Sequence, residues 1–263
     1  MKVISLLTDF GLRDGNVGVM KGVIWNIAPN VQIADLSHTI EPQNIMAGIL
    51  VLGRSTPYFP VGSIHIAVVD PGVGTTRRPI AARLGDQYFV GPDNGLFTRM
   101  LEKSEFEKKP VQIVHANNPK FWLKDISNVF HGRDIFSPVA AYIANGVPLT
   151  EIGEEIHDPI RFEIPKPVKK GKTWHGQIIH IDYFGNIATN IRREHLQDYK
   201  DVRVILAGTE LCGMVKTFGE RPVGDLIILY GSTGDLIVSV VNGSAAAKLG
   251  VKIGDPLEVN SVE

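Results

Sequence analysis

An acid and a guanidinium stand in this chain at a spacing that could hold a small polar molecule such as water. Five of the six residues before Asp70 are apolar, which predicts a buried strand rather than a helix. A turn rich in proline and glycine follows and leads to Arg77. Ligands of open α/β sheets bind beyond the carboxyl ends of the strands, so residues 70–77 are a candidate site. A plain β-turn begun by Asp70 and Pro71 is the alternative interpretation.

Other polar residues also follow predicted strands or begin loops, and in a parallel sheet many of them would share one edge. They are Asp9, Asp35, His38, Asp93, Asn94 and His131. The Asp9 carboxylate suits a ribose diol, because it can accept a hydrogen bond from both hydroxyls. His131 precedes a glycine, which would let a ligand approach closely. The alternative for each is a structural role, and residues 93–95 favour a turn.

The second half of the chain holds an acid, two aromatic residues and an amide around one glycine, within residues 182–186. Asp182 could bind an ammonium group, and Asn186 could both donate to and accept from a purine edge. Phe218 and the turns at residues 230–234 and 242–244 would complete a pocket for a base. An edge hairpin with asparagine in its turns is the structural alternative.

Composition narrows the class of protein. The 263 residues carry a net charge of -1, which gives no reason to expect nucleic acid or an anionic membrane as a partner. The single cysteine, Cys212, excludes an internal disulfide, and no apolar run approaches a membrane span. No phosphate-binding or dinucleotide-binding glycine motif is present. We therefore expect a cytoplasmic protein without a cofactor.

A metal site is a further alternative. Asp9, His38, Asp70 and His131 are residue types that suit several metals. The sequence has no compact histidine motif to support such a site, so we predict no metal.

Elements that could position these residues alternate through residues 1–160. Short apolar runs predict strands at residues 3–7, 31–36, 64–69, 80–84, 87–90 and 111–114, and helical spacing predicts helices at 17–27, 45–52 and 135–144. Asp14 and Asp134 are expected to cap two of these helices, and residues 85–86 to form a hairpin turn. This alternation predicts an α/β domain with a mainly parallel sheet flanked by helices.

The pattern changes after residue 158. Three prolines and five basic residues occur within residues 159–172, so residues 161–172 are expected to be a linker. Six short β-like runs follow, at residues 174–181, 187–191, 202–206, 226–230, 236–240 and 257–259. They predict a smaller all-β, barrel-like domain over residues 173–263.

Four motifs occur in the order seen in one known family. They are residues 8–11 (Thr-Asp-Phe-Gly), residues 70–77 (Asp-Pro-Gly-Val-Gly-Thr-Thr-Arg), residues 130–134 (Phe-His-Gly-Arg-Asp) and residues 182–186 (Asp-Tyr-Phe-Gly-Asn). Together the motifs resemble those of the S-adenosyl-L-methionine (SAM) hydroxide adenosyltransferases, which are relatives of the SAM-dependent fluorinases and chlorinases. The resemblance covers essentially the whole chain.

This resemblance implies hydrolysis of SAM to adenosine and L-methionine, by attack of water or hydroxide on the ribose C5′. An Asp-Arg-His set that handles the water corresponds to Asp70, Arg77 and His131. The implied substrate-binding residues are Asp9 for the ribose, Asp14, Asp182 and Ser232 for the methionine, Asn186 and Phe218 for the adenine, with Phe184 and Gly243 beside them. It also implies a homotrimer with sites at the subunit interfaces.

Departures from the halogenase pattern favour the branch that uses water. Halogenases differ from this chain at two positions of these motifs. They resemble one another in having an aromatic residue in place of Asp70 and a hydroxyl residue in place of Gly132. They also tend to carry an inserted loop soon after the arginine that corresponds to Arg77. A SAM-dependent halogenase and a SAM or adenosine sensor without turnover remain the alternatives to a hydrolase.

Overall fold

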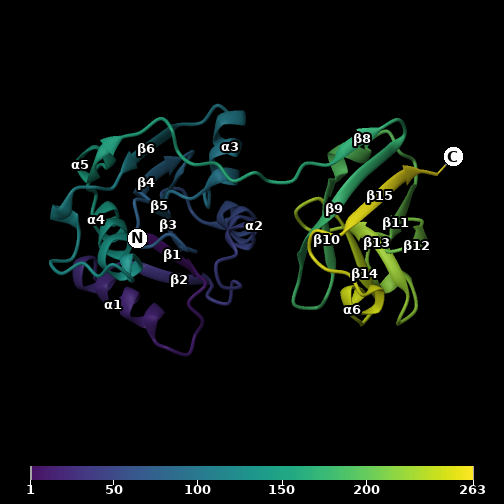
Figure 1. Cartoon of the computed structure of the whole chain (residues 1–263), viewed down its shortest axis with the longest axis horizontal. Helices are drawn as coiled ribbons and strands as arrows, with labels where there is room; N and C mark the ends of the chain where they lie inside the picture. The colour runs from purple at the N-terminus through teal and green to yellow at the C-terminus, as the bar shows by residue number, and fades with distance from the viewer. Residues whose placement is uncertain (1, 263) are drawn as a thin grey trace. The chain divides into compact units, whose positions relative to one another are not determined.

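The structure is a computed structural model that describes residues 2–262. The chain divides into two compact units, with the boundary between Glu163 and Ile164 (Figure 1). The segment expected to be a linker contains a short strand, β8 (Val168–Lys170), which pairs with the first long strand of the second unit. Each unit has its own hydrophobic core.

The first unit is built on a seven-stranded sheet. Its order is β2 (Gln32–Ser37), β1 (Val3–Thr8), β3 (Ile64–Val68), β5 (Gln87–Pro92), β4 (Pro79–Leu84), β6 (Val111–His115) and β7 (Glu154–Glu155). The pairings among β2, β1, β3 and β5 are parallel, whereas those from β5 through β4 and β6 to β7 are antiparallel. The sheet is therefore mixed, and the expectation of a mainly parallel sheet is only partly confirmed.

The reversal begins at the hairpin predicted from the sequence. Leu84 pairs with Gln87, and Gly85 between them has a φ of 64°, a conformation that glycine adopts without strain. Because two residues connect the strands, β4 and β5 must be antiparallel. This hairpin places β5 between β3 and β4, although β4 comes before β5 in the chain.

Helices cover both faces of this sheet. Helices α1 (Asn16–Ile27) and α4 (Ser137–Ala144) pack together, as do α2 (Ile45–Ser55) and α3 (Thr98–Phe106) (Figure 1). Alternate residues of β1 point to opposite faces. Ile4 and Leu6 lie in the core with Met20 of α1, whereas Leu7 faces Gly48 of α2. Shorter elements complete the unit: η1 (Thr56–Tyr58), η2 (Pro119–Phe121), the π-helical turn η3 (Gly132–Phe136) and α5 (Leu149–Ile152).

The second unit is an antiparallel sheet that curls into a nearly closed barrel. Its order is β12 (Thr209–Cys212), β11 (Val202–Leu206), β15 (Pro256–Ser261), β9 (Thr173–Ile181), β10 (Ile187–Arg192), β14 (Asp235–Val240) and β13 (Leu226–Tyr230). Met214, just after β12, bridges Ile228 of β13 and so brings the two ends of the sheet together. The short helices are η4 (Arg193–Leu196), η5 (Phe218–Glu220) and α6 (Ala245–Leu249). The predicted barrel-like β-domain is confirmed.

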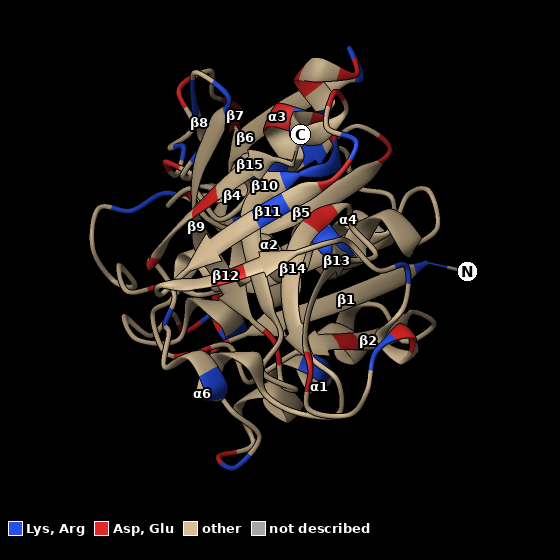
Figure 2. Ribbon diagram, turned by 90° about the vertical axis from the view of Figure 1, so that its right-hand side faces the viewer, with Lys and Arg blue, Asp and Glu red and all other residues tan. Residues whose placement is uncertain are grey.

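Charged residues of both signs are interspersed along the elements of both units (Figure 2). This distribution fits the net charge of -1. Over residues 2–262, the helices are all too short or too polar to span a membrane.

Candidate active site

The carboxyl end of β3 delivers Asp70 into a loop that folds back on itself. Arg77 donates from Nε to Asp70 Oδ1 at 3.1 Å and from Nη2 to Asp70 Oδ2. The two side chains are only 4% (Asp70) and 6% (Arg77) exposed, so they form a buried, bidentate ion pair. Gly74 has a φ of 75°, and a Cβ there would lie 2.2 Å from the Asn128 carbonyl oxygen. Only glycine therefore fits at that point of the loop.

His131, which lies 54 positions after Arg77 in the chain, contacts this pair. Its Nδ1 lies 3.2 Å from Arg77 Nη2. A guanidinium only donates, so Nδ1 accepts and the neutral imidazole carries its proton on Nε2. Burial lowers the pKa of His131, and the positive charge of Arg77 lowers this pKa further. The imidazole is consequently neutral near pH 7 and presents an N–H donor at Nε2.

A π-helical turn positions His131. The turn starts at Gly132, and such turns often occur at functional sites. A Cβ at Gly132 would lie 3.4 Å from the ring of Phe10, so the glycine allows close packing there. Phe136, at the end of the turn, has its ring 5.4 Å from the Arg77 guanidinium carbon. The face of the Phe136 ring therefore makes a cation–π contact with the Arg77 guanidinium.

One donor of this cluster has no partner within residues 2–262. Arg77 Nη1 is buried and makes no hydrogen bond to the residues that the structure describes. A buried N–H group normally finds an acceptor. With Nη1 of Arg77, Nε2 of His131 and the remaining lone pairs of Asp70, the cluster offers both donors and acceptors. That combination suits a water molecule or hydroxide ion.

Asp9 lies just past β1 and is half-buried. Its Oδ2 accepts from the backbone N–H of Gln43 at 2.8 Å. Gln43 has a φ of 67°, so the carboxylate helps to hold a strained residue just before α2. Among the described residues, Oδ1 of Asp9 has no hydrogen-bond partner. One oxygen is therefore left for a ligand hydroxyl.

Two predicted helix caps are wrong. Helix α1 starts at Asn16 with Gly15 as its N-cap, in a left-handed conformation and without a side-chain cap. Asp14 lies one residue further out and is exposed. Asp134 lies inside the π-helical turn, where its carboxylate accepts from the Ser127 N–H at 2.8 Å and from Arg133. It fixes the loop before His131 rather than capping α4.

Asp35 and His38 belong to a separate network at the end of β2. His38 Nε2 lies 2.9 Å from Asp35 Oδ1, and His38 Nδ1 lies 2.9 Å from the Thr8 hydroxyl. Lys21 reaches Asp35 at 2.7 Å. Within the described part of the chain, no three His, Cys, Asp or Glu side chains are grouped so that they could hold a metal.

In the second unit, Asp182 organises the turn between β9 and β10. Its Oδ1 accepts from the N–H groups of Phe184 and Asn186, both at 2.9 Å, and its Oδ2 accepts from Asn186 Nδ2 at 2.8 Å. The hairpin expected as the structural alternative is thus present. Asn186 keeps its side-chain oxygen as an acceptor, and Phe184 is 73% exposed at the tip.

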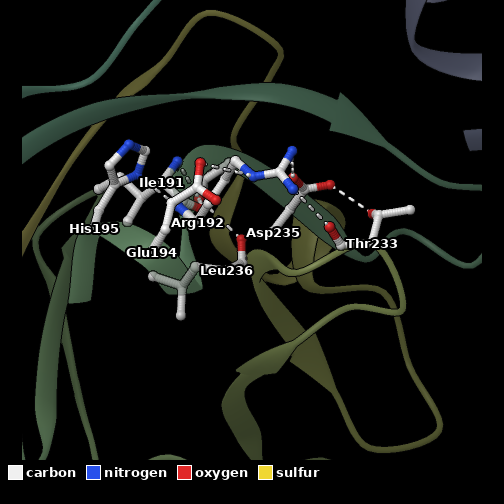
Figure 3. A network of polar contacts seen from close by, with 8 residues as sticks. Ile191, Arg192, Glu194, His195, Thr233, Asp235 and Leu236 are labelled. Atoms are coloured by element: carbon white, nitrogen blue, oxygen red, sulfur yellow. Dashed lines mark hydrogen bonds and ion pairs between the residues drawn. The ribbon is translucent and has the colours of Figure 1, made fainter. Parts of the chain in front are cut away.

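The turn that carries Ser232 is held by a polar network (Figure 3). Arg192 donates to the Thr233 carbonyl at 3.1 Å and lies 3.6 Å from the buried carboxylate of Asp235. The Thr233 hydroxyl donates to Asp235 at 2.7 Å. Ser232 itself is exposed at this turn.

The other two candidates of this unit lie in separate segments. Phe218 begins η5 and is 46% exposed, and Gly243 lies exposed in the turn before α6. The turn that contains Gly185 is anchored to the same segment, because the Ala246 N–H donates to the Gly185 carbonyl at 3.0 Å. Asp182 and Gly243 are therefore carried by turns that lie close together.

Sequence reasoning missed Phe136, whose ring packs against Arg77, and the ion pair that Arg78 forms with the candidate Asp93. The signals were an aromatic residue five positions beyond His131 and a second arginine next to the first. Neither indicates a partner until the fold is known.

An α/β unit that carries an Asp-Arg-His cluster and is joined to a small β-barrel defines a two-domain class of proteins, and comparison with known families identifies it. Residues 4–153 match the model of the SAM hydroxide adenosyltransferase N-terminal domain, and residues 176–258 match that of the C-terminal domain. The chain belongs to the SAM hydroxide adenosyltransferase family.

Curated relatives and solved structures agree with this membership. Proteins named (R)-S-adenosyl-L-methionine hydrolase from Salinispora tropica and Thermus thermophilus are each 36% identical, over 98% of this chain and 97% and 100% of theirs. A fluorinase from an Actinoplanes species is 27% identical over 90% of each chain. The crystal structure of an uncharacterized conserved protein from Thermotoga maritima matches with a TM-score of 0.89 and 37% identity, over 98% of this chain and 99% of that one.

Proposed function

We propose that this chain hydrolyses SAM to adenosine and L-methionine, by attack of water or hydroxide on the ribose C5′. The observation that carries this proposal is the buried Asp70–Arg77 pair with the half-buried His131 beside it, in which one guanidinium donor has no partner among the described residues. The relatives named (R)-SAM hydrolase, 36% identical over nearly the whole chain, support it.

Their contacts support a separate role for each of the three proposed catalytic residues. The sulfonium of SAM is already a good leaving group, so the chemical difficulty lies at the nucleophile, since bulk water is a very weak acid. Arg77 stays protonated and stabilises negative charge on the attacking oxygen through Nη1. Asp70 accepts a hydrogen bond or the proton from the water.

His131 orients the water rather than removing its proton. Its Nδ1 already accepts from Arg77, so the free ring atom is the Nε2–H donor. A hydrogen bond from this Nε2–H to the attacking water would orient one lone pair of the water oxygen. In-line attack opposite the sulfur requires such positioning, because rates depend steeply on the alignment of the reacting atoms.

Substrate binding is divided between the two domains in this proposal. In the domain of residues 1–160, Asp9 holds the ribose hydroxyls and Asp14 contributes to the methionine end. In the domain of residues 173–263, Asp182 and Ser232 hold the methionine, and Asn186 and Phe218 bind the adenine, with Phe184 and Gly243 beside them. The free Oδ1 of Asp9 and the free side-chain oxygen of Asn186 support these assignments.

The resemblance to the family extends the proposal to assembly. We propose a cytoplasmic homotrimer in which each site takes residues from two subunits, and which works without metal or cofactor. Light scattering of the purified protein tests the trimer, and assays with and without a chelator test the independence of metal.

A product assay tests the reaction. The protein is incubated with SAM in water enriched in the heavy oxygen isotope. We expect methionine together with adenosine whose 5′-hydroxyl oxygen carries the label. Unlabelled adenosine, or SAM recovered intact although it binds tightly, contradicts hydrolysis, and the latter result indicates a sensor. The similarity to fluorinases makes halogenation the second candidate. Formation of 5′-halo-adenosine on addition of chloride or fluoride would establish it.

A further inference from the structure

The loop that carries Asp70 and Arg77 is held at both of its ends by two neighbouring residues. Asn94 Nδ2 donates at 2.8 Å to the carbonyl of Val69, the residue before Asp70. Arg78, the residue after Arg77, donates to Asp93 Oδ2 from Nε at 2.9 Å and from Nη2 at 2.6 Å. The Asp93 N–H also donates to the Arg78 carbonyl at 2.9 Å.

The sheet order explains how one pair of residues reaches both ends. β3 delivers Asp70, β4 starts just after Arg78, and β5 lies between them. The loop from residue 70 to residue 78 therefore crosses the end of β5. Asp93 and Asn94 directly follow β5 and so stand beneath the crossing.

Asp93 is built into the fold as a buried, fully used group. It is 1% exposed, and its second oxygen, Oδ1, accepts from the Ile160 N–H at 2.8 Å. Asn94 likewise uses both ends of its amide, because its Oδ1 accepts from the Leu96 N–H at 3.2 Å. These contacts fix the side chains of Asp93 and Asn94. The two fixed side chains can in turn hold the loop of residues 70–78 in place.

We propose that Asp93 and Asn94 are positioning residues, which hold both ends of the Asp70–Arg77 loop and thereby set the geometry of the catalytic cluster. This inference rests on the proposed function only for its kinetic test. Neither residue is assigned contact with the substrate. We call Asp93 and Asn94 the brace of this loop. A displacement of the reacting groups by about 1 Å is enough to lower a rate about 100-fold, so loss of the brace should lower the rate of catalysis.

Two nearly isosteric variants test the proposal. Asp93→Asn keeps an acceptor for Ile160 but removes the carboxylate from Arg78. Asn94→Asp keeps the acceptor for Leu96 but cannot donate to Val69. Asp158→Asn is the matched control, since Asp158 pairs with the same Arg78 at 2.8 Å, yet its side chain is 80% exposed.

For both brace variants we expect kcat for SAM hydrolysis to fall about 10- to 100-fold with little change in KM, because the loss concerns the position of the nucleophile. The control should keep the wild-type kcat. All assays are run below the melting temperature of the variant. If Asp93→Asn fails to fold, Asn94→Asp and Arg78→Lys carry the same test.

A spectroscopic readout separates positioning from simple stability. The ¹⁵N shifts of the His131 ring report whether Nδ1 accepts from Arg77. In the brace variants we expect these shifts to change, and in Asp158→Asn to stay as in the wild type. A lower melting temperature with unchanged kcat and unchanged His131 shifts would overturn the proposal. If the wild type does not hydrolyse SAM, the proposed function fails, but the His131 shifts still decide whether the brace exists.

Discussion

Removing one member of the Asp70–Arg77 pair should destabilise the first unit far more than its contact alone would suggest. The two side chains are 4% and 6% exposed, and Arg77 Nε lies 3.1 Å from Asp70 Oδ1. Asp70→Ala leaves a buried guanidinium whose remaining contacts are the neutral His131 and the ring of Phe136. Arg77→Ala leaves a buried carboxylate with no cation.

The magnitude follows from the distance and the burial. Two unit charges about 3 Å apart attract by about 5 kcal/mol at an effective dielectric constant near 20. Breaking a buried pair by removing one partner costs about 3–5 kcal/mol, because the other charge stays desolvated. At about 2–4 °C per kcal/mol for a protein of this size, each single variant should melt roughly 6–20 °C lower.

The double variant Asp70→Ala/Arg77→Ala provides the decisive comparison. It leaves no buried charge, so its loss of unfolding free energy should be smaller than the sum of the two single losses by about 2–3 kcal/mol. Hydrogen exchange of the β1 and β3 amides measures this for the first unit alone. Strictly additive losses would refute the reasoning about the pair. All three variants should lose hydrolysis, and full activity in both single variants would refute the assignment of the site.

Three further predictions follow from groups in or near the two cores. Burial and the charge of Arg77 lower the pKa of His131 below 6.5. In a pH–rate profile, kcat should therefore stay constant from about pH 8 to about pH 6.5 and decrease only below pH 6.5. A decrease of kcat that begins above pH 6.5 and is absent in His131→Gln would contradict this. Burial lowers the pKa of His65 from 6.5 to about 4. Between these pH values the unfolded chain binds a proton that the folded chain does not, so the unfolding free energy should fall by about 3 kcal/mol as the pH decreases through this window. His65→Gln should remove that part of the slope, and an unchanged slope in urea titrations would exclude His65 as its source. Gly185→Ala should destabilise the second unit by more than about 1 kcal/mol, because φ is 83° and the new Cβ would lie 2.0 Å from Ser244 Oγ; an unchanged melting temperature would contradict it.

The sequence predicted the elements of the first unit better than their directions. Apolar runs locate β1 and β3, because burial on both faces leaves a nearly continuous apolar stretch, and a shorter run locates the less buried β6. Such a run carries no information about which way a strand points. Only the hairpin at Gly85 revealed a direction, and the antiparallel pairing of β6 with β4 arises from long-range packing.

In the second unit, strand β12 (Thr209–Cys212) was missed. It alternates exposed and half-buried residues, with Glu210 and Cys212 facing solvent, so it has no apolar run. Helix α6 (Ala245–Leu249) was also missed, because five residues are too few to show a helical period. Its N-cap is nevertheless visible in the sequence, as Ser244 accepts from the Ala247 N–H at 3.1 Å.

The contact between Asp70 and Arg77 could be predicted because both residues lie in one short loop. The contact with His131 could not, since it joins residues 54 positions apart. It came from the family resemblance alone. The brace shows the same limit, as Asp93 was correctly predicted to lie in a turn, but its partner depends on the order of β3, β5 and β4.

The structure also sharpens the choice between water and halide as the nucleophile. Both oxygens of Asp70 already accept hydrogen bonds from Arg77, yet a carboxylate retains further lone pairs that can accept from water. A halide has no proton to donate. The Asp70 carboxylate is an acceptor-only group, so it disfavours a halide beside it, whereas a water molecule can donate a hydrogen bond to it. The Nε2–H of His131 would serve either nucleophile, so in the proposed mechanism the carboxylate of Asp70 is the feature that favours water.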